Sequence, residues 1–137
     1  YLTNYGDFLK DKYRNKGIIF LGGIFNKIHL DNMRYYSSIY LHGHSVGGTN
    51  PALLEAMAAK TLILAHNNQF NRSVLDGNAF YFSSSVELGR LFQQDLYDKK
   101  SVFTSNNLKK IEEVYRWPFV IDQYEAYFEK ILKISSK

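Results

Sequence analysis

The chain has 137 residues, of which 45% are hydrophobic and 22% are charged, a balance typical of one folded globular domain. Its net charge of +4, from 17 Lys and Arg against 13 Asp and Glu, forms no basic stripe, so we expect no nucleic-acid partner. Because the chain has no cysteine, a disulfide scaffold, a cysteine-ligated zinc site, an iron–sulfur cluster and a thiol nucleophile are excluded. Its apolar runs are far shorter than the about 20 residues needed to span a bilayer.

Hydrophobic periodicity predicts a chain in which helices and strands alternate. Apolar residues at helical spacing indicate amphipathic helices, whereas short runs that are apolar at every position are typical of strands covered on both faces. Taken in chain order, the predicted elements are a helix at 4–16, a strand at 18–21, a helix at 28–36, a strand at 39–41, a helix at 51–59, a strand at 61–65, a short helix at 71–75, a strand at 79–82, and helices at 86–96, 105–115 and 118–134.

Individual residues support several of these boundaries. Gly17 interrupts the first helical pattern. Pro51 suits the first turn of a helix, because its φ is already helical and its missing N–H is not needed there. Asn50 and Ser85 are the expected N-caps of the helices that follow them, since their side-chain oxygens can accept a free backbone N–H.

The alternation of helix and strand predicts an α/β fold with a Rossmann-like parallel sheet and flanking helices. We interpret residues 1–137 as a single domain. In open parallel sheets, ligands bind at the carboxyl ends of the strands. The loop at residues 42–50 follows one predicted strand and precedes a predicted helix, so it is the first candidate for a binding site.

This loop has the sequence HGHSVGGTN. Its glycines allow backbone N–H groups to approach an anion closely, and the N-terminus of the following helix favours a phosphate. The loop matches neither the dinucleotide-binding fingerprint nor a phosphate loop that ends in Gly-Lys-Ser or Gly-Lys-Thr. On spacing alone, a tight turn without a ligand is the alternative interpretation.

The stretch HGHSVGGTNPALLEAM, residues 42–57, resembles the signature of the retaining glycosyltransferases of family 4, in the nucleotide-binding C-terminal half of the GT-B fold. In particular it is similar to a bacterial subgroup that includes rhamnosyltransferase-like enzymes of surface polysaccharide synthesis. The resemblance covers nearly all of the chain, with further similar segments at residues 18–22, 35–41, 61–65 and 117–132.

The resemblance implies a nucleotide-sugar-binding domain of a retaining enzyme of the hexosyltransferase type. It implies that the Glu55 carboxylate accepts hydrogen bonds from the ribose hydroxyls of the nucleotide, and that Gly23 and Ile24 border the nucleobase. The loop residues that it places against the phosphates and the sugar are Gly47, Gly48, Thr49 and Asn50.

Each candidate residue also has a structural interpretation. Glu55 lies near a helix N-terminus, where a carboxylate favours the helix dipole without any ligand. His44, the candidate catalytic residue, would donate a hydrogen bond to the β-phosphate or to a sugar hydroxyl, and its alternative is a partly buried histidine satisfied within the fold. The same two interpretations apply to His42. Gly23 and Ile24 can equally mark the end of a strand.

The sequence departs from the family pattern in two respects. The family pairs two glutamates eight positions apart, and the position eight before Glu55 is occupied by Gly47. The family's Gly-Arg turn, the lysine that helps neutralise the diphosphate, and the acceptor domain have no counterpart in these residues. Because the sequence also begins with Tyr1, we expect a fragment that lacks the acceptor domain and the start of the donor domain and is inactive alone.

The resemblance also implies the partners. The donor is a nucleotide-diphosphate sugar, with a UDP-sugar favoured, the acceptor is a glycan or lipid-linked glycan, and neither a metal nor another cofactor is required. The expected setting is bacterial O-antigen, lipopolysaccharide or capsule synthesis in the cytoplasm, with peripheral contact at the inner face of the cytoplasmic membrane. The alternative is a catalytically inactive nucleotide-binding or protein-interaction domain of the same fold. A flavodoxin-like or receiver domain is disfavoured, since the predicted strand ends carry no acidic cluster or flavin loop.

Overall fold

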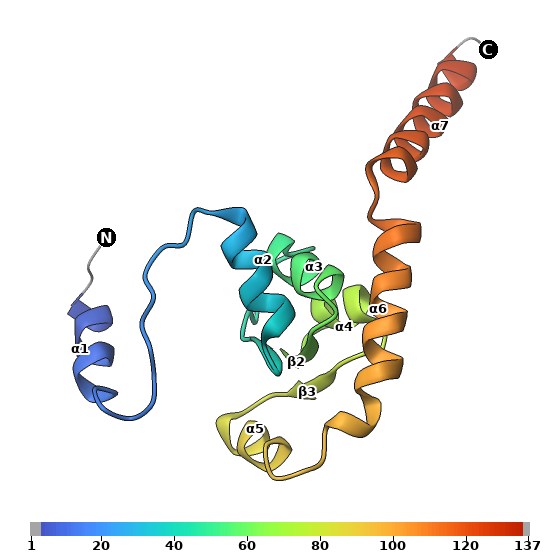
Figure 1. The fold of residues 1–137 in the computed structure, drawn as a ribbon. Helices are drawn as coiled ribbons and strands as arrows, with labels where there is room; N and C mark the ends of the chain where they lie inside the picture. The colour runs from blue at the N-terminus through green and yellow to red at the C-terminus, as the bar shows by residue number, and fades with distance from the viewer. Residues whose placement is uncertain (1–3, 136–137) are drawn as a thin grey trace. The chain divides into compact units, whose positions relative to one another are not determined.

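The computed structural model describes residues 4–135, and the chain divides into two compact units. The first, Tyr1–Leu30, is called the N-terminal unit, and the second, Asp31–Lys137, is called the sheet unit. Figure 1 shows the elements of both units in chain order. The interpretation of residues 1–137 as one domain stays a prediction.

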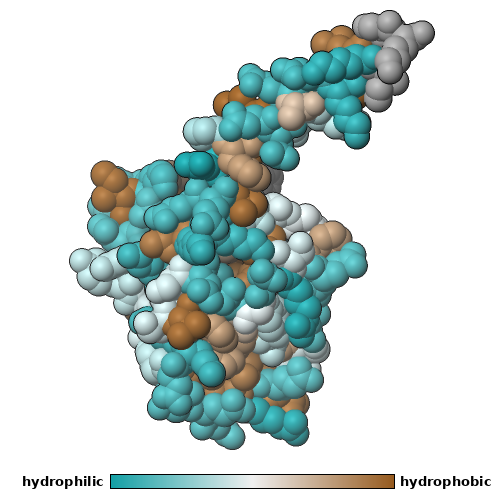
Figure 2. All heavy atoms as spheres, turned by 90° about the vertical axis from the view of Figure 1, so that its right-hand side faces the viewer, coloured by the Kyte–Doolittle hydropathy of each residue, from teal (hydrophilic) through white to brown (hydrophobic). Residues whose placement is uncertain are grey.

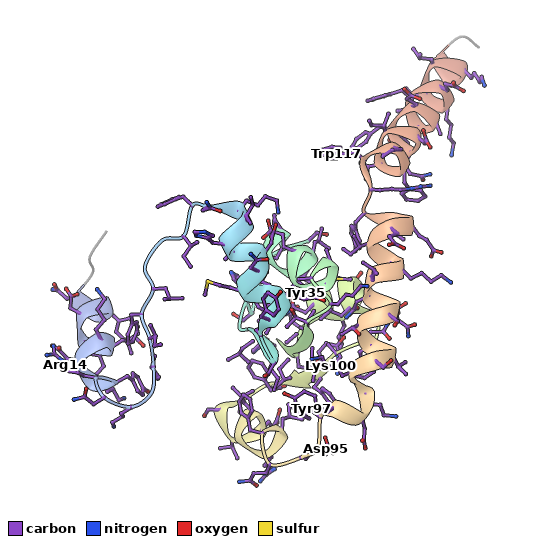
Figure 3. All side chains as sticks on the ribbon, viewed as in Figure 1. Arg14, Tyr35, Asp95, Tyr97, Lys100 and Trp117 are labelled. Carbon is purple, nitrogen blue, oxygen red and sulfur yellow. The ribbon has the colours of Figure 1, made fainter. Side chains whose placement is uncertain are left out.

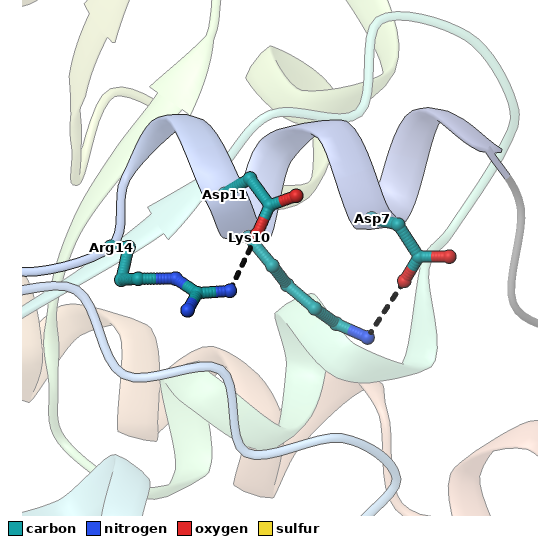
Figure 4. A network of polar contacts seen from close by, with 4 residues as sticks. All are labelled: Asp7, Lys10, Asp11 and Arg14. Atoms are coloured by element: carbon teal, nitrogen blue, oxygen red, sulfur yellow. Dashed lines mark hydrogen bonds and ion pairs between the residues drawn. The ribbon is translucent and has the colours of Figure 1, made fainter.

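The N-terminal unit contains helix α1, Asn4–Lys12, and the start of helix α2, Lys27–Tyr36. Helix α1 ends four residues earlier than predicted, because Asn15 and Gly17 adopt left-handed conformations with φ of 62° and 74°. Figure 4 shows two ion pairs in this region, Lys10 Nζ to Asp7 Oδ1 at 3.4 Å and Arg14 Nη2 to Asp11 Oδ1 at 2.6 Å. Both pairs are exposed, so each contributes at most about 1 kcal/mol to stability.

The predicted strand at residues 18–21 is wrong. Residues 18–26 have no regular secondary structure, and the side chains of Ile18 and Ile19 are 49% and 80% exposed. An apolar run becomes a strand only when a neighbouring strand pairs with its backbone, and in the described residues every paired strand lies in the sheet unit. Gly22, with a φ of 70°, interrupts any extended segment directly after the run. The described sheet therefore has three strands instead of the four predicted.

The sheet unit is an α/β structure with a parallel sheet of order β1-β2-β3 flanked by helices, as the alternating pattern predicted. Ile39 pairs with Leu62 at the start of β1 and β2, and Leu64 pairs with Phe80 at the start of β3. The elements of this unit after α2 are β1 (Ile39–His42), α3 (Pro51–Ala58), β2 (Leu62–His66), α4 (Gln69–Leu75), β3 (Phe80–Phe82), α5 (Ser85–Leu91), the 3₁₀ helix η1 (Tyr97–Lys99), α6 (Lys100–Val114) and α7 (Trp117–Ser135).

The core lies on both faces of the central strand β2. Ile63 and Ala65 face one apolar cluster, which contains Leu53 and Met57 of α3. Leu62 and Leu64 face the other cluster, against which α5 packs. Figure 1 shows α3 and α5 on opposite sides of the strands. Because β2 is buried on both faces and paired on both edges, it needs apolar residues at every position, which is the pattern seen in its sequence.

The start of α5 differs by one residue from the prediction that Ser85 is its N-cap. Ser84 is the N-cap, and its side chain accepts a hydrogen bond from the N–H of Glu87. Glu87 Oε2 in turn accepts the N–H of Ser83 at 2.7 Å. The glutamate thus reaches back to the residue before the cap, and a glutamate stands three residues after Ser84 but not after Ser85.

The chain between α5 and α6 also differs from the prediction. Helix α5 ends at Leu91 instead of residue 96, and η1 leads directly into α6, which begins five residues earlier than expected. Asp95 Oδ1 accepts the N–H of Tyr97 at 3.0 Å, and Lys100 Nζ lies 5.5 Å from the centre of the Tyr97 ring. These three residues are labelled in Figure 3. Local polar contacts of this kind favour a turn over a continued helix.

Helix α7 exposes an apolar stripe. Figure 2 shows brown apolar side chains beside teal polar ones on this helix, and Figure 3 labels Trp117 at its start. Trp117 is 78% exposed, and the other large apolar residues exposed on this helix are Ile121, Tyr124, Tyr127, Phe128, Ile131 and Leu132. Among residues 4–135, no helix is both long enough and apolar enough to cross a membrane.

We expect Leu64→Ala to lower the free energy of unfolding by about 2–5 kcal/mol, because Leu64 is fully buried on the central strand and its removal leaves a cavity. Leu41→Ala, on the edge strand β1, is the matched control, since Leu41 is 48% exposed and should lose about 1 kcal/mol or less. Urea denaturation of the two variants measures the difference. Equal losses would contradict the placement of the core around β2.

Candidate functional site

The glycine-rich loop at residues 43–50 connects the carboxyl end of β1 to the N-terminus of α3. The predicted cap is confirmed: Asn50 is extended, with φ of −94° and ψ of 121°, and its side chain accepts the N–H of Ala52 at 3.0 Å. Pro51 occupies the first helical turn, as predicted. Since the strands are parallel, this helix N-terminus lies at the edge of the sheet where all three strands end.

Two neighbouring glycines of this loop differ in what the backbone demands of them. Gly47 has a φ of 108°, which strains any residue with a side chain. Gly48 does not have a positive φ of this kind, and a Cβ built on it meets no heavy atom within 4 Å. The fold therefore requires glycine at position 47, whereas nothing in the described residues requires it at position 48.

Two asparagines anchor the loop to the next strand. Asn68 Nδ2 and Asn71 Nδ2 both donate to the main-chain oxygen of His44, at 2.9 and 3.0 Å. Asn71 is buried and also donates to the main-chain oxygen of His66, at the end of β2. These contacts hold the start of the loop against the carboxyl edge of the sheet. Sequence reasoning missed them, although the run of asparagines after the strand was a signal for side chains that bind backbone carbonyls.

Polar aromatic rings form a column along one face of β1 and into the loop. The ring of His42 lies 6.0 Å from that of Tyr40 and 4.7 Å from that of His44, measured between centroids. His42 is only 1% exposed, and neither of its ring nitrogens has a hydrogen-bond partner among the described residues. Burial, and secondly the charge of His44, lowers the pKa of His42 below its ordinary value of 6.5, so this imidazole is neutral at pH 7.

The loop and the end of β1 present His44 differently from His42. His44 belongs to the exposed part of the loop, and its main-chain oxygen, held by the two asparagines, fixes its position. Its ring stacks on the buried ring of His42. The structure thus places an exposed imidazole beside a buried neutral one at the mouth of the glycine-rich loop.

Glu55 lies one turn into α3 and makes an ion pair that the sequence did not reveal. Arg34 Nη2, from α2, lies 2.7 Å from Glu55 Oε2, and Arg34 Nη1 lies 3.5 Å from Asp31 Oδ1. The Arg34 side chain is 9% exposed and that of Glu55 is 40% exposed. Burial raises the pKa of Tyr40, on which the charges of Arg34 and Glu55 act in opposite directions. The two charges of this ion pair therefore act on Tyr40, the first ring of the column.

The structure brings six of the eight predicted site residues into the sheet unit. They are His44, Gly47, Gly48, Thr49, Asn50 and Glu55. Gly23 and Ile24 belong to the N-terminal unit, in a segment without regular secondary structure. The site described above is built from the sheet unit alone.

A metal site was not expected. Within residues 4–135, no group of three or more His, Cys, Asp or Glu side chains could hold a metal ion. The arrangement offers the backbone N–H groups of the glycine-rich loop and the positive end of the α3 dipole, which suit an anionic ligand.

Comparison of the sequence with protein-family models and with curated proteins found no match.

We expect the free energy of unfolding of the chain to fall as the pH drops below about 6.5, with His42 as one cause. The pKa of His42 is lowered in the folded chain, so the unfolded chain binds the proton more strongly, and stability is lost as the pH falls from 6.5 toward the folded pKa. His42→Asn should therefore flatten this pH dependence, as measured by urea midpoints between pH 5 and 8.

The control for this experiment is His29→Asn, which makes the same replacement at an exposed histidine of α2 and measures the general effect of removing an imidazole. An unchanged slope in His42→Asn would mean that other groups account for the pH dependence.

Proposed function

We propose that this chain is the nucleotide-sugar-binding domain of a retaining glycosyltransferase with the GT-B fold. The observation that carries the proposal is the loop at residues 43–50, which resembles the family signature and leads into the Asn50-capped N-terminus of α3 at the carboxyl edge of a parallel sheet. Glycine at position 48 supports it, because neither the backbone conformation nor the surrounding atoms demand a glycine there. A diphosphate lying against the loop would explain this glycine, because a side chain at position 48 would occupy its space.

The catalytic problem in such a transfer is one of charge. As the bond between the sugar and the diphosphate breaks, negative charge grows on the leaving phosphate and positive charge grows on the sugar. The N–H groups of the first turn of α3 are already bonded to Asn50, so the helix would contribute the positive end of its dipole, and the backbone N–H groups of the glycine-rich loop would donate to the leaving phosphate. Groups held in place before the reaction stabilise the growing negative charge without reorganising. His44, exposed beside them, would donate a hydrogen bond to the β-phosphate or to a sugar hydroxyl.

The carboxylate of Glu55 would bind the nucleoside part of the donor. An ionised carboxylate accepts hydrogen bonds and cannot donate them, which suits the two hydroxyls of a ribose. No general base is required in this domain, because the acceptor would enter from the second domain across a cleft. The chain alone would bind the donor without transferring its sugar.

The remaining parts of the proposal follow from the resemblance. The donor would be a nucleotide-diphosphate sugar, a UDP-sugar in the first place, bound without a metal. The acceptor would be a glycan or lipid-linked glycan of bacterial O-antigen, lipopolysaccharide or capsule synthesis. The enzyme would work in the cytoplasm, in peripheral contact with the inner face of the cytoplasmic membrane.

One observation favours a second candidate function. Gly47 stands where the family has its first glutamate, which contacts the donor sugar, and its φ of 108° suits glycine better than any acidic residue. A domain that binds the nucleotide but lacks this sugar contact could be catalytically inactive, serving as a nucleotide-binding or protein-interaction domain of the same fold. Sugar transfer by the protein that contains this domain, assayed with UDP-sugars, separates the two functions.

We expect Gly48→Val to abolish binding of nucleoside diphosphates while leaving the melting temperature nearly unchanged. A Cβ at this position has no heavy atom within 4 Å, so stability should change by about 0.5 kcal/mol or less, but the valine would occupy the space of the phosphates. Calorimetric titration with UDP, GDP and dTDP, paired with thermal melts, measures both effects.

Gly47→Ala gives the opposite pattern for comparison, since its left-handed backbone should lower the melting temperature whether or not a ligand binds there. The proposal fails if the wild-type chain binds none of the three nucleotides, or if Gly48→Val binds them as tightly as the wild type.

A further inference from the structure

Arg34 is the most deeply buried charge described in the sheet unit, and nothing in the resemblance assigns it a role. Its side chain is 9% exposed, and its Nε and Nη1 atoms are buried without a hydrogen-bond acceptor in the described residues. Taking a guanidinium out of water costs free energy that a single ion pair does not fully return. An apolar residue of similar volume would serve a purely structural contact at least as well.

Arg34 is positioned by contacts that do not involve Glu55. Its main-chain oxygen accepts hydrogen bonds from Thr61 Oγ1 and from Ser37 Oγ, which tie the end of α2 to the residue before β2. The carboxylate of Asp31, one turn earlier, adds a second negative charge at 3.5 Å. Arg34 is therefore held by its own helix and by the sheet, whereas the half-exposed Glu55 side chain has Arg34 as its ion-pair partner.

The contact uses only part of the Glu55 carboxylate. Arg34 Nη2 lies 2.7 Å from Oε2, so this ion pair engages one of the two carboxylate oxygens. The Glu55 side chain is 40% exposed, so part of it remains accessible to solvent. A carboxylate that is held at one oxygen and partly exposed is suited to accept hydrogen bonds from a ligand in one defined orientation.

We infer that Arg34 is a positioning residue that holds the Glu55 carboxylate, through Nη2 and Oε2, in the orientation that accepts the ribose hydroxyls of a bound nucleotide. This inference rests on the proposed function. Arg34 itself does not touch the nucleotide, and its effect on binding passes through Glu55. Its removal should therefore affect only ligands that carry the ribose hydroxyls.

The test measures the affinity of the chain for UDP and for 2′,3′-dideoxy-UDP, by calorimetry, in Arg34→Met, Glu55→Gln and the double variant. Arg34→Met should weaken UDP binding about tenfold or more, the effect expected from losing a charged hydrogen bond, and leave binding of the dideoxy nucleotide unchanged. The double variant should bind UDP no more weakly than Glu55→Gln alone, because both changes act on the same contact. If the wild type binds GDP and not UDP, the same measurements are made with GDP and 2′,3′-dideoxy-GDP.

Two further variants control for stability and charge. Arg34→Lys keeps the charge but not the geometry of the contact, so it should restore part of the UDP affinity, and it also serves if Arg34→Met fails to fold. Arg90→Met removes an exposed arginine from α5, on the opposite face of the sheet, and should leave both affinities unchanged.

The outcomes separate this inference from the proposed function. If the wild type binds no nucleoside diphosphate, the proposed function fails. If it binds UDP but Arg34→Met loses affinity equally for UDP and for 2′,3′-dideoxy-UDP, the donor site stands and the role of Arg34 in positioning Glu55 is overturned. The same holds if the losses of the two single variants add up in the double variant.

Discussion

Burial of both faces of β2 is the constraint on which the sheet unit depends. A strand with Leu62 and Leu64 on one face and Ile63 and Ala65 on the other cannot meet water on either side, so helices must cover both faces. Its two edges are filled by β1 and β3, which run parallel to it, and the chain must cross over through a helix between successive strands. Every strand therefore ends at one edge, and the loop at residues 43–50 lies there as a consequence.

Successive side chains of a strand point to opposite faces of the sheet, and on β1 this places polar rings beside that loop. On β1, Ile39 packs against one apolar cluster and Tyr40 against the other, and the Tyr40 side of the strand continues through His42 to His44. Apolar packing thus gives way to imidazole rings within four residues. The buried nitrogens of His42 and Arg34 lower the stability of the fold, because desolvated polar atoms without partners are costly. Both residues contact candidate site residues, since the ring of His42 stacks on that of His44 and Arg34 makes an ion pair with Glu55. Violations of this kind are typical of functional sites.

Part of the candidate site could be predicted from the sequence because it depends on neighbours along the chain. The cap of Asn50, the helical start at Pro51 and the position of Glu55 one turn later all arise within a few residues, and the structure has each of them. The anchoring of His44 by Asn71 and the ion pair of Glu55 with Arg34 join residues 20 or more positions apart, on the order of two secondary-structure elements. No local pattern signals which distant side chain will be the partner.

The sequence by itself determined the order of helices and strands in the sheet unit, the parallel sheet, and the glycine-rich loop between β1 and α3, because periodicity, capping and turn chemistry act over a few residues. Only the tertiary structure decided that residues 18–21 stay outside the described sheet, that Gly47 and not Gly48 carries the left-handed backbone, and that Arg34 makes an ion pair with Glu55. An apolar run is a strand only if another strand offers hydrogen bonds, and a buried charge is tolerated only where an opposite charge reaches it. Both conditions are set by parts of the chain that are remote in sequence.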